Sequence, residues 1–172
     1  CALSLSGFSQ ETTAFEEIEL KHADRLTRDA NTPKGASKLI GNVSFTHKEA
    51  IMYCDSAYLF EDNRLKAFGH VKIEDGDSLL MLGDSLSYNG NTQLAKVRGR
   101  VTIDNKSSIL KTRFLDYNRN TGRADYYGGG EINSTQEKLN LVSEKGHYFS
   151  EAKIFHFKQN VIMTHPDYVI KT

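Results

Sequence analysis

Apolar and polar residues alternate in short runs along most of the chain, and one of these runs recurs at nearly constant spacing. It begins as GNVSFTH at Gly41 and returns every 28 to 31 residues, at Gly69, Gly99, Gly130 and, more weakly, Asn160. Two positions after each start lies a Val or an Ile. Alternation with a period of two predicts a strand with one buried face, and the leading glycines predict turns with positive φ. The steady spacing predicts stacked supersecondary units.

A second, longer alternating run follows the glycine-headed one and reads IMYCDSAYL, LMLGDSLSY, LKTRFLDY and LVSEKGHY in successive copies. Its clearest copy places every second residue from Leu80 to Tyr88 on one expected face, with Asp84 in the middle. A third, short run such as Leu65 and Ala67 precedes the next glycine, after a polar turn such as NGNT. Each unit is therefore predicted to be a short strand, a longer strand, a turn and a return strand.

Such a unit cannot bury its apolar face alone, so the units are expected to stack into one elongated all-β domain over residues 15–172. A chain of 172 residues has the length of a single domain. Strands at the two ends of the stack keep unpaired N–H and C=O groups, which either need caps or serve as joints. Because PDYVIKT from Pro166 runs in register with DSLLMLG from Asp77, we expect the chain to be a piece of a longer repeat-bearing protein.

Residues 1–14 are interpreted as an N-terminal tail. CALSLSGFSQ is apolar and rich in small residues, like the end of a signal peptide, and an acylated lipoprotein cysteine at Cys1 is the alternative. Both interpretations indicate export. Two cysteines make no disulfide framework, so Cys54 is expected to be a small, partly buried hydrophobe. No apolar run of about 18 residues, the length of a membrane-spanning helix, is present.

Charge and candidate chemistry exclude several functional classes. Lys plus Arg and Asp plus Glu both number 22, so no net field attracts nucleic acid. The six histidines lack metal-ligand spacing, and neither a metal nor another cofactor is expected. Asp24, Asp55 and Asp84 recur with the repeat, whereas catalysis needs one site. We therefore expect them to accept N–H groups from turns or neighbouring strands, and no catalytic residue is assigned.

The order and spacing of these runs resemble the OstA-like family of periplasmic lipopolysaccharide-transport proteins, typified by LptA and the N-terminal domain of LptD. The resemblance is carried by IELKHADRL, LIGNVSFTHKEAIMYCDSAYL and LKAFGHVKIEDGDSLLMLGDSLSY, and it covers residues 15–172. It implies a folded-over β-jelly roll, in which two antiparallel sheets lean together in a V and hold the acyl chains of lipid A. It also implies a non-enzymatic carrier that binds lipopolysaccharide and joins other transport components, or further copies of itself, through edge strands.

This interpretation assigns two sets of site residues. The acyl chains are expected to contact the apolar interior at Ile18, Leu20, Val43, Phe45, Ile51, Tyr53, Val71, Ile73, Leu80, Leu82, Leu86, Val101, Ile103 and Leu115. A basic cluster is expected either to touch lipid phosphates or core sugars at the rim or to be a solvated face, and it comprises Lys96, Arg98, Arg100, Lys111 and Arg113.

The repeat has three irregularities, and two other functions stay open. Arg113 and Glu144 replace the recurring aspartate, residues 128–130 (GGG) predict a bulge, and the run at Ile132 lacks its second apolar residue, which predicts a thinner core toward that end. One alternative function is a β-solenoid enzyme or binding module acting on extracellular polysaccharide. The other is a structural spacer in a longer chain.

Overall fold

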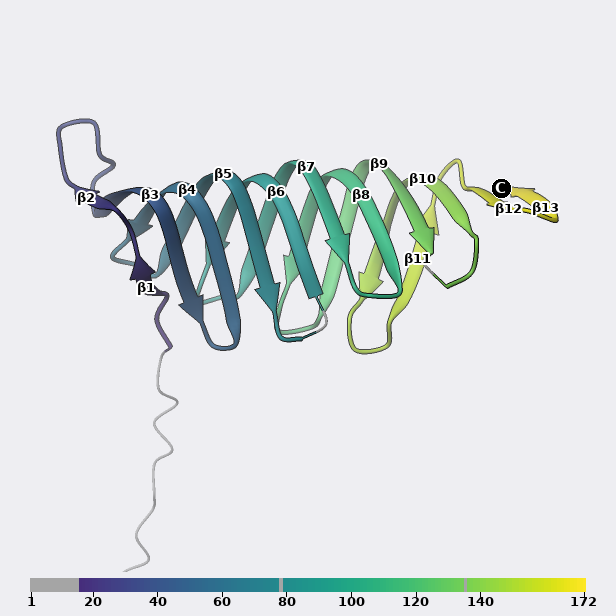
Figure 1. The fold of residues 1–172 in the computed structure, drawn as a ribbon, viewed down its shortest axis with the longest axis horizontal. Helices are drawn as coiled ribbons and strands as arrows, with labels where there is room; N and C mark the ends of the chain where they lie inside the picture. Colours follow the sequence, from purple (N-terminus) through teal and green to yellow (C-terminus); the bar gives the residue numbers. More distant parts are fainter. Residues whose placement is uncertain (1–15, 78, 135) are drawn as a thin grey trace, which may run out of the picture.

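The computed structural model describes residues 16–77, 79–134 and 136–172, and within them the chain forms thirteen β-strands and no helix (Figure 1). The strands are β1 (Glu19–His22), β2 (Arg25–Thr27), β3 (Ala36–His47), β4 (Ala50–Phe60), β5 (Arg64–Asp75), β6 (Leu79–Asn89), β7 (Leu94–Asp104), β8 (Ser108–Asn118), β9 (Arg123–Ser134), β10 (Asn140–Phe149), β11 (Ile154–Lys158), β12 (Ile162–His165) and β13 (Tyr168–Lys171). Over this part of the chain there is accordingly no helix long and apolar enough to cross a membrane.

All thirteen strands belong to one open sheet, and every pairing in it is antiparallel. From β3 to β10, each strand pairs with the next one along the chain, as successive hairpins require. The expected elongated all-β fold is confirmed. The β-solenoid fold of the alternative function is wrong, because the coils of a parallel solenoid would pair each strand with its counterpart one repeat away.

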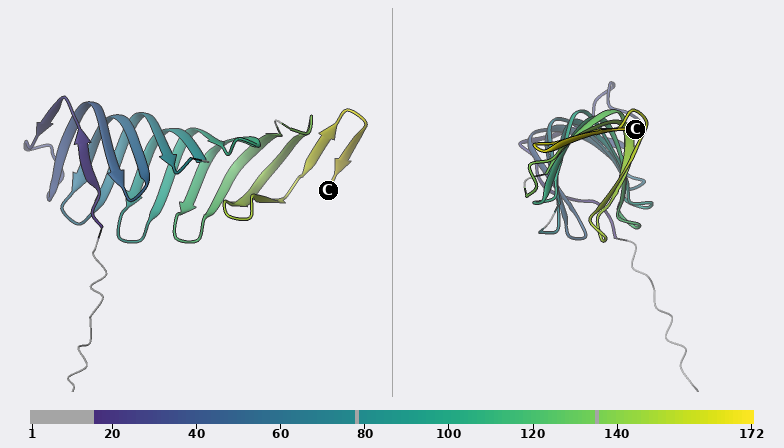
Figure 2. Two further views of the ribbon diagram at one scale, coloured as in Figure 1. Left: turned by 60° about the horizontal axis from the view of Figure 1, so that its bottom comes forward. Right: turned by 90° about the vertical axis from the view of Figure 1, so that its right-hand side faces the viewer.

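Each long strand crosses a β-bulge near its middle. The register of β3 against β4 shifts between Ile40 and Val43, and corresponding shifts recur in every long pair up to β9 against β10, where the shift lies between Ser143 and Lys145. A bulge adds an unpaired residue and bends the strand. Because these bulges lie side by side, the sheet folds along one line, which we call the fold line. Seen end-on, the strands curve around a central axis (Figure 2).

The fold line divides the sheet into two walls. The first wall contains the half-strands that end at the turns near residues 47–50, 75–79, 104–108 and 134–140. The second wall contains the half-strands that end at the turns near residues 60–64, 89–94, 118–123 and 149–154. We call the long side where these two rows of turns face each other the mouth. In the end-on view of Figure 2, the hairpin ends of both rows lie on the same side of the molecule, opposite the fold line.

The repeat unit differs from the predicted one. The expected return strand at Leu65 and Ala67 and the glycine-headed strand at Val71 and Ile73 are two halves of the single strand β5. Gly69 between them lies on the fold line with a φ of +75°, and the equivalent Gly41 and Gly99 have φ of +80° and +99°. Positive φ is therefore confirmed at these three glycines, but it serves a bend within one strand rather than a turn between two. At Gly130 the prediction is wrong, because Gly128 and Gly129 take the positive φ there.

The core lies between the two walls and runs along the long axis. Its largest fully buried side chains are Phe45, Leu39, Leu65, Met81, Ile103, Leu110, Leu115, Tyr126 and Leu141. Among the described residues, none after Tyr148 is fully buried. The core therefore thins toward the C-terminal end, as predicted. There β12 and β13 extend beyond the body (Figure 1), with Tyr168, Val169 and Ile170 each about half exposed.

Candidate functional site

The candidate site is the apolar interior, and its side chains fill the space between the walls. Leu39, Phe45 and Leu65 have no accessible surface, and the same holds for Leu110 and Leu115 farther along. The interior includes a hollow of about 20 Å³ beneath the mouth, which is far too small for an acyl chain. An acyl chain therefore enters this interior only if the two walls move apart.

Ten of the predicted interior residues pack inside. The buried ones are Ile18, Val43, Phe45, Val71, Ile73, Leu86, Val101, Ile103 and Leu115, and Leu20 packs partly buried against them. Interior residues that the sequence analysis did not assign to the site include Leu39, Met52, Leu65, Met81, Val97, Leu110, Tyr126 and Leu141.

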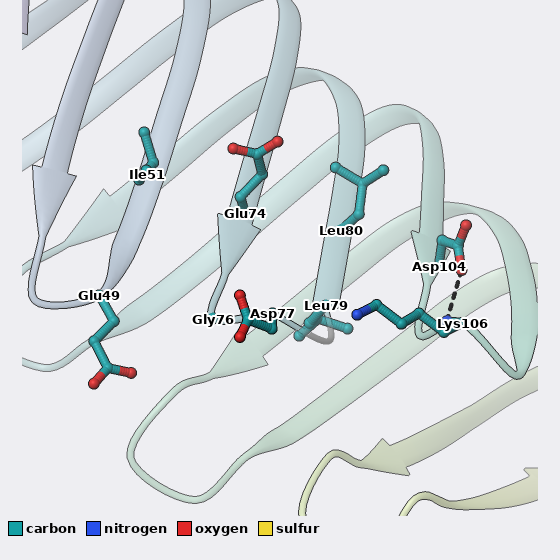
Figure 3. Close-up of a pocket in the computed structure, with 9 residues that line it drawn as sticks. All are labelled: Glu49, Ile51, Glu74, Gly76, Asp77, Leu79, Leu80, Asp104 and Lys106. Atoms are coloured by element: carbon teal, nitrogen blue, oxygen red, sulfur yellow. Dashed lines mark hydrogen bonds between the residues drawn. The ribbon is translucent and has the colours of Figure 1, made fainter.

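The interior placement expected for Ile51, Tyr53, Leu80 and Leu82 is wrong, because all four lie on the outer face of the first wall. Tyr53 and Leu82 are 36% and 38% exposed. Figure 3 shows Ile51 and Leu80 on this outer face, above an open groove that the hairpin turns border. The physical cause is the bulge, since one extra residue exchanges the inner and outer faces of a strand. In β6, Met81 on one side of the bulge and Leu86 on the other therefore both face inward.

The recurring aspartates have the structural role predicted for them. The Asp84 carboxylate accepts the backbone N–H of Arg100 at 3.0 Å and a hydrogen bond from the Arg100 guanidinium at 2.8 Å. These hydrogen bonds from Arg100 lower the pKa of Asp84 below its usual range. Asp55 lies 2.8 Å from His70 Nδ1, and Asp24 accepts a hydrogen bond from the Asn42 side chain at 3.0 Å. In these three repeats the carboxylate thus binds the residue that follows the fold-line glycine.

The fold line changes character where the aspartate is missing. Phe114 stacks on Tyr127 with ring centroids 5.2 Å apart, and it covers Gly128 in the position that a carboxylate occupies in the earlier repeats. Gly128 and Gly129 both have positive φ, so the bulge predicted at residues 128–130 is confirmed. In the last repeat Glu144 accepts a hydrogen bond from Asn160, which restores a carboxylate contact.

The five predicted rim residues lie on the outer surface. Arg98 pairs with Asp116 at 2.5 Å, and its guanidinium lies 5.5 Å from the ring centre of Tyr127. Arg100 is paired with Asp84 as described above. Arg100, Lys111 and Arg113 border a groove on the outside of the fold line, and Lys96 points outward from β7 between the buried Ala95 and Val97.

Three tyrosines of the second wall contact polar side chains of the first wall across the mouth. They are the last inward-facing residues of β6, β8 and β10, so their rings bury against the core and their hydroxyls reach the opposite row of turns. The pairs are Tyr88 with His47 Nδ1 at 2.7 Å, Tyr117 with Asp75 Oδ2 at 3.2 Å, and Tyr148 with Asn105 Nδ2 at 2.9 Å. Burial raises the pKa of Tyr88 and of Tyr117 to about 12, which keeps both phenols protonated at neutral pH.

An ion pair reinforces the middle of the mouth. Arg119, in the turn after β8, donates hydrogen bonds to both carboxylate oxygens of Asp75 at 2.9 and 3.0 Å. It also donates to the backbone carbonyl of His47 at 3.3 Å. The side chains of Arg119 and Asp75 are only 14% and 12% exposed. The pair lies between the open groove of the mouth and the small hollow inside, since both are bordered by Asp75, Tyr117 and Arg119.

Comparison with known proteins gives one family match. A model of the family described as OstA-like protein matches residues 16–172, which include every strand of the sheet. No curated protein matches the chain. Among solved structures, the chain is similar to LptH, described as the LptA homologous periplasmic component of the conserved lipopolysaccharide transport device from Pseudomonas aeruginosa. The identity is 12%, the match covers 87% of this chain and 94% of that chain, and the TM-score is 0.38.

Proposed function

Because this chain belongs to the OstA-like family, we propose that it is an exported, periplasmic carrier that binds lipopolysaccharide and passes it toward the outer membrane without catalysing a reaction. The observation that carries the proposal is the apolar interior between the two walls, which continues through successive repeats rather than ending in one pocket. The ligand part in question is the acyl chains of lipid A.

A carrier of lipid A has to cover a large apolar area without holding the acyl chains in fixed positions. Each CH₂ group moved out of water is worth about 0.8 kcal/mol, so several acyl chains need an extended apolar lining. The inward side chains are mainly Leu, Val, Ile and Ala, which have no hydrogen-bonding groups, and the tyrosines among them direct their hydroxyls to protein partners. A lining of this kind shelters the chains from water and lets them slide from one repeat to the next.

The proposed contacts are the interior residues named above, with Met52 and Met81 in place of the outward-facing Ile51, Tyr53, Leu80 and Leu82. Methionine suits this role because its unbranched side chain adapts to irregular apolar partners. The fold-line carboxylates are occupied by structural contacts, which supports carriage rather than polysaccharide hydrolysis.

The open sheet edges support a second part of the proposal, which is that transport components of the same fold join end to end. Strand β13 ends the first wall and is exposed along its whole length. Its unpaired main-chain groups can extend the sheet with a strand from another component or from a second copy. Such a joint would continue the apolar interior from one molecule into the next.

Site-specific photo-crosslinking in cells tests the proposal. A photoreactive amino acid at Phe45 or Ile73 is expected to capture lipopolysaccharide, because these side chains face the interior. The controls are Lys72, which is next to Ile73 in β5 but points outward, and Leu82, which is apolar but lies on the outer face. Equal capture at the inward and outward positions, or cleavage of a polysaccharide by the purified protein, would contradict the carrier function.

A further inference from the structure

The two long sides of the interior are held together in different ways. At the fold line every long strand passes from one wall to the other, so the walls share a continuous backbone with ladder hydrogen bonds on both sides of each bulge. At the mouth, no ladder of main-chain hydrogen bonds joins the two rows of turns among the described residues. Side chains make the contacts there. The mouth is therefore the side along which the walls can separate while the sheet stays intact.

The mouth contacts recur with the repeat. Each tyrosine reaches a polar residue 41, 42 or 43 positions earlier in the chain, so successive repeats contribute successive contacts. Each tyrosine contributes one hydrogen bond to a polar side chain of the opposite row, and both groups can hydrate when the walls part. Such a pair contributes roughly as much as one ordinary hydrogen bond, which water can replace.

The N-terminal end of the mouth is closed by a short backbone segment. The carbonyl of Glu16 lies 3.0 Å from His47 Nε2 on the first wall and accepts a hydrogen bond from the Asn63 side chain on the second wall. The N–H of Ile18 donates to Asn63 Oδ1 at 2.7 Å, and the Ile18 side chain is buried in the core. This segment spans both rows of turns, so it narrows access from that end.

We propose that the mouth is a lateral gate: acyl chains reach the interior sideways when the tyrosine contacts and the Asp75–Arg119 pair open, one repeat after another. The proposal rests on the carrier function described above. The gate is polar on its outer side and apolar directly beneath. Opening it replaces polar contacts within the protein with contacts to water, and the entering acyl chain covers the apolar core that the opening uncovers.

A covalent bridge across the mouth tests the gate. Glu49 on the first row of turns and Asn120 on the second are both exposed and border the same groove, and neither makes a contact that holds the mouth closed. The variant carries Glu49→Cys and Asn120→Cys, with both native cysteines, Cys1 and Cys54, replaced by alanine. A short bis-maleimide then links the rows, and binding of fluorescently labelled lipid A from detergent is measured by co-elution.

A bridge within one row is the matched control. Asp62 and Asn91 are exposed neighbours in two turns of the second row, where the Asn91 side chain donates to the Asp62 carbonyl at 3.1 Å. Linking Asp62→Cys to Asn91→Cys adds the same chemistry without joining the walls. The gate predicts that the bridge across the mouth abolishes lipid A binding and the control bridge leaves it intact. Normal binding with the mouth bridged overturns the gate but not the carrier. Absence of binding in the unbridged protein overturns the carrier.

Loosening the gate gives an independent readout. Replacing Tyr88, Tyr117 and Tyr148 with Phe keeps the buried rings and removes the hydroxyls that contact the opposite row. Because one neutral hydrogen bond contributes about 1 kcal/mol, each replacement is expected to speed lipid A loading by about fivefold where that contact limits opening. An unchanged loading rate in the triple variant, with a far-ultraviolet circular dichroism spectrum that shows it folded, overturns the role of the tyrosines.

Discussion

The fold-line glycines make a sharp test of the architecture, because two of them share a backbone conformation but differ in surroundings. Gly99 and Gly129 have φ of +99° and +91°. A Cβ added at Gly99 would lie 2.2 Å from Asp84 Oδ2 and 2.6 Å from Asp84 Cβ, whereas one added at Gly129 would meet no atom within 4 Å. Alanine therefore carries the same backbone strain at both positions, about 1–3 kcal/mol. Only at Gly99 does it also overpack the fold line.

Overpacking adds about 1–3 kcal/mol, so Gly99→Ala is expected to destabilise the protein by about 2 kcal/mol more than Gly129→Ala. For a domain of this size, that difference lowers the melting temperature by roughly 4–8 °C. Thermal unfolding followed by far-ultraviolet circular dichroism measures it. Gly69→Ala should behave like Gly99→Ala, since its Cβ would lie 2.2 Å from Asp55 Oδ2. Equal melting temperatures for the Gly99 and Gly129 variants would refute the close approach of the carboxylate.

Three further predictions concern the core, the mouth and pH, and urea unfolding measures the first two. Leu65→Ala, in the fully buried interior, should cost about 2–5 kcal/mol, whereas Leu82→Ala on the outer face should cost less than about 1 kcal/mol; similar values would contradict the assignment of faces. Arg119→Gln should cost about 2 kcal/mol, because the Asp75 carboxylate loses its cation and keeps only the hydrogen bond from Tyr117. Adding Asp75→Asn should restore part of this loss, and a further loss would argue against the pair. Burial, together with two nearby cations, lowers the pKa of His147 below 6.5. Protonation therefore favours the unfolded chain, so folding stability should fall as pH drops below about 6.5, and His147→Gln should remove that part of the loss. An NMR titration midpoint of His147 above 6.5 would refute this.

The sequence was sufficient to predict the fold class and the inner face of the glycine-headed runs. Val43, Val71 and Val101 lie in the first-wall halves of β3, β5 and β7, where no bulge interrupts the alternation, so the period of two assigns their side correctly. The same reasoning predicted the carboxylate contacts, because a polar residue that recurs once in every repeat has to find a recurring partner.

The alternation failed where it was extended through a bulge. From Leu80 to Tyr88 the apolar residues occupy every second position, which predicts one shared face. The extra residue in the middle of β6 instead places Leu80 on the outer face and Tyr88 on the inner face. A signal was present in Met81 and Leu86, two apolar residues five positions apart, which share a face only if a residue is inserted between them. The outer Leu80 and Leu82 hid this signal by supplying an uninterrupted pattern.

The mouth contacts were beyond sequence reasoning for a different cause. Tyr88 and His47 belong to strands that are not neighbours in the sheet, and their meeting depends on how far the two walls curve toward each other. That curvature is set by the angle at every bulge, which no short run of residues encodes. Only the regular recurrence of Tyr88, Tyr117 and Tyr148 could have suggested a shared role.

The bulge in every long strand also decides what can vary in this architecture. Since each hairpin carries its own bend, its own pair of turns and its own share of the interior, the width of the interior is fixed within a repeat and its length by the number of repeats. Adding or removing a whole hairpin pair therefore changes the length of the interior and leaves its width unchanged. A single-residue insertion in one half-strand keeps the length of the interior but exchanges the two faces of that half-strand. It therefore interrupts the apolar interior at one repeat.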